Sequence, residues 1–342
     1  MTIFSEREHS PSCSSLASWA FWKQCGQQLC ACCRPTWHWF QADRTRAELA
    51  EAVTSTLPIA GLQADRVSIK GPHRPSNQDR CYSDCGLGIF VVADGMGGRR
   101  GGEEASQLVI DRLPWRIATA LAHSGLEPEA IKQAIREACE AAELDMRHYA
   151  ARHPECHSMG ATLVIALVVE NRLYVAHAGD CRGYLFRAQQ LLQLTHDHNL
   201  AQSLVDAQLL TETEAAKHPW RHRVFNWVGA RPSHQPLAIA ERKLEVGDRI
   251  LLTSDGLTSV VANEQVATIL RRSPTPCEAV RRLAKQALRN ESHDNISCIV
   301  VDFLAHPAHV HPQAPQSPLS GPSVGRLIGV APASTIVSWQ VS

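Results

Sequence analysis

The sequence has no long apolar run and no excess of charge. No stretch in its 342 residues reaches the roughly 18 uninterrupted apolar residues that a membrane span needs, so we expect no transmembrane segment. Lysine plus arginine equals aspartate plus glutamate, at 34 each. A nucleic-acid-binding groove would show as clustered basic residues, whereas the densest cluster has helical spacing typical of a solvated helix face: Arg281, Arg282, Lys285 and Arg289. We therefore predict no nucleic-acid binding.

A secretory signal is also lacking. The segment Ser5-Glu6-Arg7-Glu8 precedes no apolar block that ends in a cleavage site, so we expect a cytoplasmic protein. Twelve cysteines would favour disulfides in a small secreted protein, but this chain is neither small nor apparently secreted. Free thiols are the expected state.

The two ends of the chain differ in composition from its middle. Residues 1–60 are rich in Trp and Cys, and we interpret them as an irregular extension or the product of a start codon assigned too early. A zinc site or reversible acylation is an alternative, but paired Cys-x-x-Cys knuckles are missing from the candidate cluster Cys25, Cys30, Cys32, Cys33 and His38. Residues 305–342 are rich in Pro, His and Ser, and we predict a disordered tail. One domain is expected at 61–304.

The middle of the chain alternates between helical and strand-like periodicity. Apolar spacing predicts helices that begin near Glu103, over 127–152 and over 276–290. A period of two predicts strands at 160–169, 173–178, 182–187, 191–194, 237–243 and 249–253, with a last strand from Ile296 and a hairpin turn at Glu170-Asn171. Long helices beside many antiparallel strands favour an α+β fold of two stacked antiparallel β-sheets flanked by helices.

Four acidic motifs lie where strand-like runs meet turns. They are Asn77-Gln78-Asp79, Asp94-Gly95-Met96-Gly97-Gly98, Ser254-Asp255-Gly256 and Asp294-Asn295. Converging strand ends can gather such carboxylates into one cluster. Neighbouring carboxylates repel unless cations neutralise them, and Mg²⁺ or Mn²⁺ suits an all-oxygen site. The motifs therefore indicate metal-assisted chemistry.

The glycine-rich loop after Asp94 could instead bind a nucleotide phosphate, because a helix N-terminus follows it. It has no Gly-Lys-Ser/Thr ending, and Arg100 breaks the dinucleotide pattern. The loop does bring backbone close to Asp94, so the Gly95 carbonyl is a candidate metal ligand.

Two further patterns are interpreted as structural. Cys181 and Arg187 have the Cys-x5-Arg spacing of thiolate phosphatases, but the alternation after Cys181 predicts a strand where a nucleophile would need a helix N-terminus. The triplet His196-Asp197-His198 cannot turn three adjacent side chains to one ion without a sharp bend. We expect Asp197 to cap the following helix.

In their order along the chain, the motifs resemble the type 2C, or PPM, family of metal-dependent serine/threonine phosphatases, in a bacterial form and over about residues 62–304. The matching pieces are Arg74-Pro75-Ser76-Asn77-Gln78-Asp79, Val92-Ala93-Asp94-Gly95-Met96-Gly97-Gly98, Gly160-Ala161-Thr162-Leu163, Ala178-Gly179-Asp180-Cys181-Arg182, Leu194-Thr195-His196-Asp197-His198, Leu252-Thr253-Ser254-Asp255-Gly256-Leu257 and Asp294-Asn295-Ile296-Ser297.

The resemblance implies a binuclear Mn²⁺ or Mg²⁺ centre between the two sheets. Its implied ligands are Asp79, Asp94, the Gly95 carbonyl, Asp255 and Asp294. Hydroxide bridging the ions would attack phosphorus directly, without a covalent enzyme intermediate. Arg74 occupies the family's phosphate-binding position, and its guanidinium suits two phosphate oxygens.

Several positions depart from the family pattern. Gln78 replaces a commoner glutamate and so removes one outer-sphere carboxylate. Met96 stands where animal relatives have a histidine proposed as the general acid, which leaves a metal-bound water, His157 or His198 for that role. Glu155 is the nearest candidate for binding a third ion, together with Asp255. Asp180 is expected to support a turn.

The resemblance implies a protein phosphatase that acts on phosphoserine and phosphothreonine and opposes a Ser/Thr kinase. Residues 211–229 match the variable flap beside the active site, which would select the phosphoprotein substrate. We expect a monomer. The alternatives are a catalytically weak phosphoprotein-binding module of the same fold, and a phosphatase dedicated to one anti-sigma-type regulator.

Overall fold

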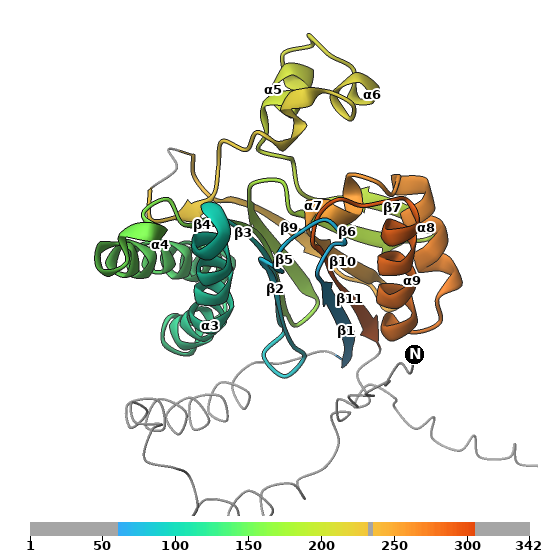
Figure 1. The fold of residues 1–342 in the computed structure, drawn as a ribbon. Coiled ribbons are helices and arrows are strands. Elements are labelled where there is room, and N and C mark those ends of the chain that lie inside the picture. The colour runs from blue at the N-terminus through green and yellow to red at the C-terminus, as the bar shows by residue number, and fades with distance from the viewer. Residues whose placement is uncertain (1–60, 232–234, 305–342) are drawn as a thin grey trace, which may run out of the picture. The chain divides into compact units, whose positions relative to one another are not determined.

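The computed structural model describes residues 61–231 and 235–304 (Figure 1). The predicted extension at 1–60 and the predicted tail at 305–342 lie outside these residues, so both stay predictions. None of the described helices is long and apolar enough to cross a membrane.

Two antiparallel sheets form the centre of the described domain. The first has the strand order β1 (Gly61–Ile69), β11 (Ile296–Leu304), β10 (Arg249–Thr253), β6 (Arg182–Arg187) and β7 (Gln190–Gln193). The second has the order β2 (Asp79–Asp84), β3 (Ile89–Met96), β4 (Gly160–Val169), β5 (Arg172–Ala178) and β9 (Ala238–Lys243), and the short β8 (Val228–Gly229) pairs with β4. All residues of β4 are buried, because layers cover both of its faces.

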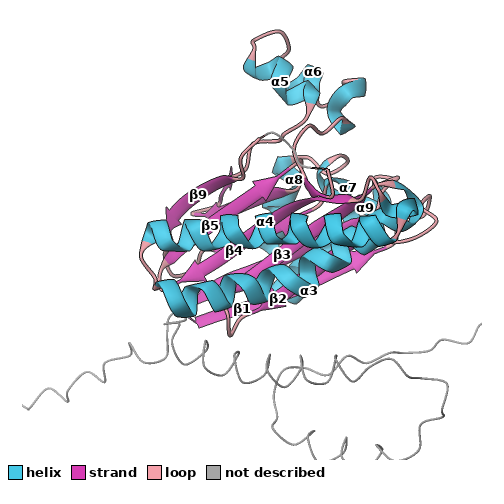
Figure 2. Ribbon diagram, turned by 90° about the vertical axis from the view of Figure 1, so that its left-hand side faces the viewer, coloured by secondary structure: helices cyan, strands magenta, loops and turns pink. Residues whose placement is uncertain are grey.

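Helices cover the outer face of each sheet. The long α3 (Gly98–Ser124) and α4 (Pro128–Arg152) lie side by side over the second sheet, as Figure 2 shows. The shorter α7 (Asp255–Thr258), α8 (Asn263–Arg272) and α9 (Pro276–Arg289) cover the first. Buried apolar side chains fill the space between the sheets and beneath each helical layer. The predicted α+β fold of two stacked sheets flanked by helices is confirmed.

A helical segment projects beyond the strands on one side (Figure 1). It contains α5 (Leu200–Asp206), α6 (Glu212–Ala215) and the 3-10 turn η2 (Pro219–His222). We call residues 199–227 the flap. The predicted flap, residues 211–229, covers α6, η2 and the short β8, whereas α5 precedes it.

Most predicted elements agree with the structure, and the differences have local causes. The helix expected near Glu103 begins at Gly98, because Gly97 takes a left-handed conformation (φ 114°) that turns the chain directly from β3 into α3. Glu170 also has positive φ, 54°, in the predicted hairpin turn between β4 and β5. The described elements that had no predicted range include β1, β2 and α8.

Candidate metal centre

The four aspartates of the acidic motifs come together where the two sheets meet. Asp79 opens β2 and is paired in register with Asp94 on β3. Asp255 opens α7 directly after β10, and Asp294 lies in the loop before β11. The two sheets are joined here, because the Ser254 hydroxyl donates a hydrogen bond of 2.7 Å to Oδ2 of Asp79.

The carboxylates raise one another's pKa. Burial raises the pKa of Asp79 to about 7, and Asp255 and Asp294 add to the rise while hydrogen bonds from Ser254 and Ser297 oppose it. Burial also raises the pKa of Asp94 well above its ordinary value, with Asp79 and Asp255 as the next largest causes. The negative charge of the cluster is therefore poorly compensated by the protein alone.

Two oxygens of the cluster are well suited to a cation. Oδ1 of Asp79 and Oδ1 of Asp255 are buried, and neither has a hydrogen-bond partner among the described residues. A buried carboxylate oxygen without a donor is costly, and hard divalent ions prefer oxygen ligands of this kind. Within residues 61–231 and 235–304 no three His, Cys, Asp or Glu side chains form a closed ligand set as they lie. Among the described residues, side chains engage three of the four carboxylates: Ser254 contacts Asp79, Arg74 contacts Asp294 and His222 contacts Asp255.

The backbone at Gly95 packs too closely for a side chain. Its N–H donates to the carbonyl of Gln78 at 3.1 Å, and a Cβ on Gly95 would lie 1.9 Å from the carbonyl oxygen of Gly102. The Gln78 amide donates to the carbonyl of Gly98 at 2.8 Å. An ionised glutamate could not donate this hydrogen bond. Gln78 therefore has a role that the sequence analysis missed when it considered only the loss of a carboxylate.

Arg74 lies at the exposed edge of the cluster. It forms an ion pair with Asp294, and 43% of its side chain is exposed. The guanidinium is therefore both held near the aspartates and accessible to a ligand from solvent. Its predicted role in binding phosphate fits this position.

Glu155 was predicted to bind a third metal ion together with Asp255, but its contacts in the structure are with other residues. It lies in the 3-10 turn η1 (Pro154–Cys156) and pairs with Arg100 at 3.5 Å and His153 at 3.7 Å. Asp180, which we expected only to support a turn, is buried, and Asp255 is the second largest cause of its raised pKa, after burial. The sequence shows that Asp180 lies two residues after a strand, as Asp255 does, but it does not show that the two carboxyl groups approach each other.

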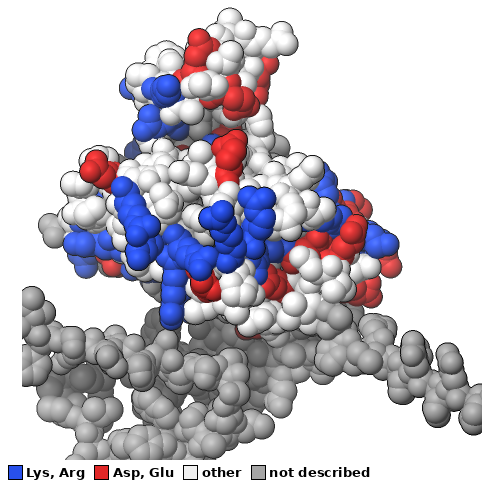
Figure 3. All heavy atoms as spheres, turned by 90° about the vertical axis from the view of Figure 1, so that its right-hand side faces the viewer, with Lys and Arg blue, Asp and Glu red and all other residues white. Residues whose placement is uncertain are grey.

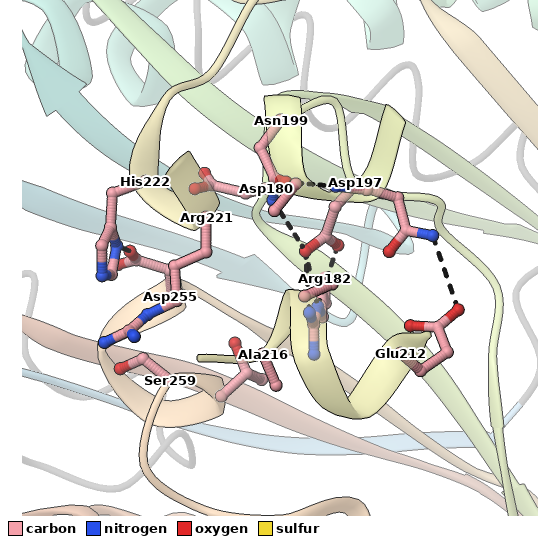
Figure 4. Close-up of a pocket in the computed structure, with 14 residues that line it drawn as sticks. Asp180, Arg182, Asp197, Asn199, Glu212, Ala216, Arg221, His222, Asp255 and Ser259 are labelled. Carbon is pink, nitrogen blue, oxygen red and sulfur yellow. Dashed lines mark hydrogen bonds and ion pairs between the residues drawn. The ribbon is translucent and has the colours of Figure 1, made fainter. Parts of the chain in front are cut away.

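The flap adds a residue that the sequence analysis missed. Nδ1 of His222 lies 3.4 Å from Oδ2 of Asp255. The flap and the core together line an open pocket of about 140 Å³, and Figure 4 shows His222 beside Asp255 on one side of it and Arg182 with Asp197 on the other. His222 could not be recognised from local sequence periodicity, because it approaches the aspartate cluster only through the fold of the flap.

The two histidines considered as general acids have other partners. His198 accepts a hydrogen bond from the N–H of Gly179 at 3.3 Å and stacks on His177 with ring centroids 4.6 Å apart. Burial lowers the pKa of His198 to about 4, so it is neutral near pH 7 and has no proton to give there. His157 is exposed, and its ring nitrogen contacts the carbonyl of Pro154.

The structural interpretation of Cys181 agrees with its environment. Cys181 is buried against the Thr162 hydroxyl at 3.3 Å, and burial raises its pKa well above the ordinary value. A thiol in this state is a poor nucleophile. The prediction that Asp197 caps a helix is wrong: Asn199 caps α5 through the N–H of Gln202, because Asp197 is engaged by Arg182.

Arg182 is expected to stabilise the base of the flap. Its Nε and Nη2 donate to the two oxygens of the buried Asp197 at 2.8 and 2.7 Å. The substitution Arg182→Lys cannot reproduce this forked contact, so we expect a loss of about 1–2 kcal/mol in unfolding free energy by urea titration. Arg172→Lys, at an exposed pair with Glu241, should change it by less than about 0.5 kcal/mol. Equal losses in the two variants would contradict the assigned role.

Comparison with known proteins identifies the family. The model of protein phosphatase 2C matches residues 74–204. The serine/threonine protein phosphatase PstP of Mycobacterium tuberculosis is 36% identical over 245 residues, which is 69% of this chain and 44% of that protein. The serine/threonine phosphatase stp of Listeria monocytogenes is 31% identical over 63% of this chain and 84% of that protein.

A solved structure supports the same assignment. The catalytic domain of the phosphatase PstP in complex with two manganese ions has a TM-score of 0.60 and 32% identity, and the match covers 71% of this chain and 98% of that domain. The chain spans less than half the length of the M. tuberculosis relative, so its similarity to that protein is to one part of it.

Proposed function

Because the chain belongs to the protein phosphatase 2C family, we propose that it is a metal-dependent protein phosphatase that hydrolyses phosphoserine and phosphothreonine. The observation that carries this proposal is the cluster of four aspartates with two buried, unbonded carboxylate oxygens, beside an arginine open to solvent. Such a site combines a cation-binding pocket with a group that binds an anion, which is what phosphoryl transfer requires of a protein.

We assign two ions, Mn²⁺ or Mg²⁺, to Asp79, Asp94, the Gly95 carbonyl, Asp255 and Asp294. Bound there, the ions would neutralise charge on the phosphate and lower the pKa of water at the site. Glu155 would bind a third ion only if its carboxylate exchanged Arg100 and His153 for the cation, so this part of the proposal requires the Glu155 side chain to reorient.

The protein's own side chains have separate tasks. Arg74 would bind two phosphate oxygens and orient the phosphorus for attack from the side opposite the leaving group. Ser254 holds Asp79 in one orientation, which leaves its other oxygen free for a cation. Asn295 fixes the loop of Asp294, since it accepts from the Gln78 N–H at 2.9 Å and donates to the Ser76 carbonyl at 3.1 Å.

The proposal is tested with peptides that differ only in the phosphorylated residue. Phosphate release from phosphoserine and phosphothreonine peptides should require Mn²⁺ or Mg²⁺ and stop with EDTA, and a phosphotyrosine peptide should react more slowly. Binding of the peptides without any release, in the presence of either metal, would instead favour the catalytically weak binding module.

The biological partners belong to the proposal too. We propose a cytoplasmic, monomeric enzyme that opposes a Ser/Thr kinase, with the flap selecting its phosphoprotein. Comparing the phosphoproteome of a deletion strain with that of its parent would identify the substrates. A change confined to one anti-sigma-type regulator would support the dedicated phosphatase.

Removal of the Arg74 guanidinium should weaken substrate capture more than chemistry. Arg74→Ala is expected to lower kcat/KM for a phosphothreonine peptide by about 10–100-fold, mainly through KM, because a bidentate contact to phosphate is lost. Arg74→Lys should recover part of the loss. Lys70→Ala, at an exposed position beyond the end of β1, serves as the control and should behave like the unsubstituted protein. A normal KM in Arg74→Ala would remove Arg74 from the site.

A further inference from the structure

A second charged feature lies on the outer face of the helical layer that covers the first sheet. A groove of about 590 Å³ runs between α8 and α9, and the residues that line it include Arg272 of α8 and Arg282, Lys285 and Arg289 of α9. Figure 3 looks onto this side of the molecule and shows a band of Lys and Arg side chains across the face. We call it the α8–α9 groove.

The sequence analysis interpreted the basic residues of α9 as a solvated helix face. Arg282, Lys285 and Arg289 do lie on one side of that helix, as their spacing predicts. What the spacing could not indicate is that Arg272, from the last turn of α8, lies on the facing wall. The cations therefore line a concave surface built by two helices.

The positive charge of the groove is largely uncompensated. Four of its lining residues are cationic and one, Glu264, is acidic. Among the described residues, Arg272, Lys285 and Arg289 are exposed and form no ion pair, whereas Arg282 pairs with Glu278. Since the chain as a whole has a formal net charge of zero, this concentration is local. It attracts anions and favours an acidic partner.

We propose that the α8–α9 groove is a docking site for an acidic segment of the protein substrate. The identification of the partner as a substrate rests on the proposed function, whereas binding of an acidic peptide does not. A groove with the neutral polar side chains of Gln265, Thr268 and Gln286 suits a peptide, which can use hydrogen bonds as well as charge. A nucleic-acid duplex would need a longer basic surface than this pair of helices offers. A membrane would need apolar side chains that insert between the lipids.

The end of the α8–α9 groove at Arg289 lies close in sequence to the metal centre. α9 ends at Arg289, and Asp294 follows five residues later. Five residues span at most roughly 18 Å, and an extended peptide covers that distance in about five or six residues. A substrate with its phosphoresidue at the aspartate cluster could therefore place an acidic segment in the groove from a short distance along its own chain.

Direct binding tests the groove independently of catalysis. Anisotropy is measured on a fluorescein-labelled phosphoserine peptide with a six-glutamate segment, in EDTA so that the peptide is not consumed. The double variant Lys285→Glu/Arg289→Glu should raise Kd at least about tenfold. The control Arg242→Glu/Lys243→Glu makes the same charge change on the exposed end of β9 and should stay within about twofold. Thermal melts establish that both variants are folded.

Three results would overturn the docking site. Equal weakening by both double variants would assign the attraction to overall charge. A peptide with glutamine in place of glutamate that binds equally well would remove the acidic segment from recognition. Tighter binding of a ten-nucleotide oligothymidylate, or of phosphatidylserine vesicles, than of the acidic peptide would assign the groove to another class of partner.

Kinetics then tests the substrate assignment. The groove variant should raise KM for the acidic phosphopeptide about tenfold, leave kcat unchanged, and hydrolyse p-nitrophenyl phosphate at the normal rate. An unchanged KM despite weaker binding would show that the acidic partner is not the substrate. If the unsubstituted protein hydrolyses neither compound with Mn²⁺, the proposed function fails while the anisotropy result on the groove still holds.

Discussion

Replacement of Asp255 by asparagine is expected to lower kcat for p-nitrophenyl phosphate with Mn²⁺ by about 10²–10³-fold. Asp255 contributes to the aspartate cluster a buried oxygen that has no hydrogen-bond partner within the described part of the chain. Asparagine has the same shape but no charge, so it would weaken cation binding while leaving the backbone of α7 in place. EDTA should lower the rate of the unsubstituted protein to a similar level.

The same variant should differ from a merely damaged protein in its stability. In EDTA, Asp255→Asn should melt at or above the temperature of the unsubstituted protein, because one of several repelling carboxylates is gone. Addition of Mn²⁺ should raise the melting temperature of the unsubstituted protein more than that of the variant, since a ligand that binds more tightly stabilises the folded state more at the same concentration.

Asp145→Asn is the matched control for Asp255→Asn. Asp145 pairs with Arg116 between α3 and α4, away from the aspartate cluster, and its substitution should leave both the rate and the Mn²⁺-dependent melting shift unchanged. Equal rates for Asp255→Asn and the unsubstituted protein would end the metal-dependent mechanism.

Gly256→Ala should damage both stability and activity. A Cβ at Gly256 would lie 1.8 Å from the carbonyl oxygen of Asn295 and 3.4 Å from Cβ of Asp294. Because this contact is with backbone, the loop of Asp294 and the start of α7 must move apart. We expect a loss of about 3 kcal/mol in unfolding free energy and at least a tenfold loss in kcat, since a misplacement of about 1 Å at a catalytic site is costly.

A second glycine distinguishes this clash from a general intolerance of alanine. At Gly101, in the first turns of α3, a Cβ would make an ordinary contact of 3.4 Å with Cβ of Met159. Gly101→Ala should raise the unfolding free energy by about 0.5–1 kcal/mol, because alanine is the better helix former. Urea titration of the two variants measures both effects, and a Gly256→Ala protein as stable as Gly101→Ala would contradict the close packing.

Local sequence patterns were sufficient for most of the fold. The runs of strand-forming residues in β4 to β6, the turn at Glu170 and the amphipathic spacing of α4 and α9 depend on residues a few positions apart, so they are visible in the sequence. β2 was missed as an element although it begins at the predicted ligand Asp79. α8 was also missed, because its apolar pattern is only ten residues long.

Roles that depend on partners far along the chain could not be predicted. Asp197 was expected to cap a helix because a helix follows it, but Arg182 reaches it from β6. Asp180 was interpreted as a turn residue. Its burial near Asp255 depends on how β5 and α7 pack in the tertiary structure. His222 approaches Asp255 only through the path of the flap.

Local sequence patterns were enough to predict the fold class, the family resemblance and the positions of the four aspartates at strand ends, because strand periodicity and turn chemistry involve neighbouring residues. Which charges face one another depends on the tertiary structure. The Ser254 hydroxyl meets Asp79 across 175 positions of sequence, and Arg74 meets Asp294 across 220. Electrostatic energy depends on distance and burial in space, so the raised pKa of the buried aspartates and the open charge of the α8–α9 groove follow from packing.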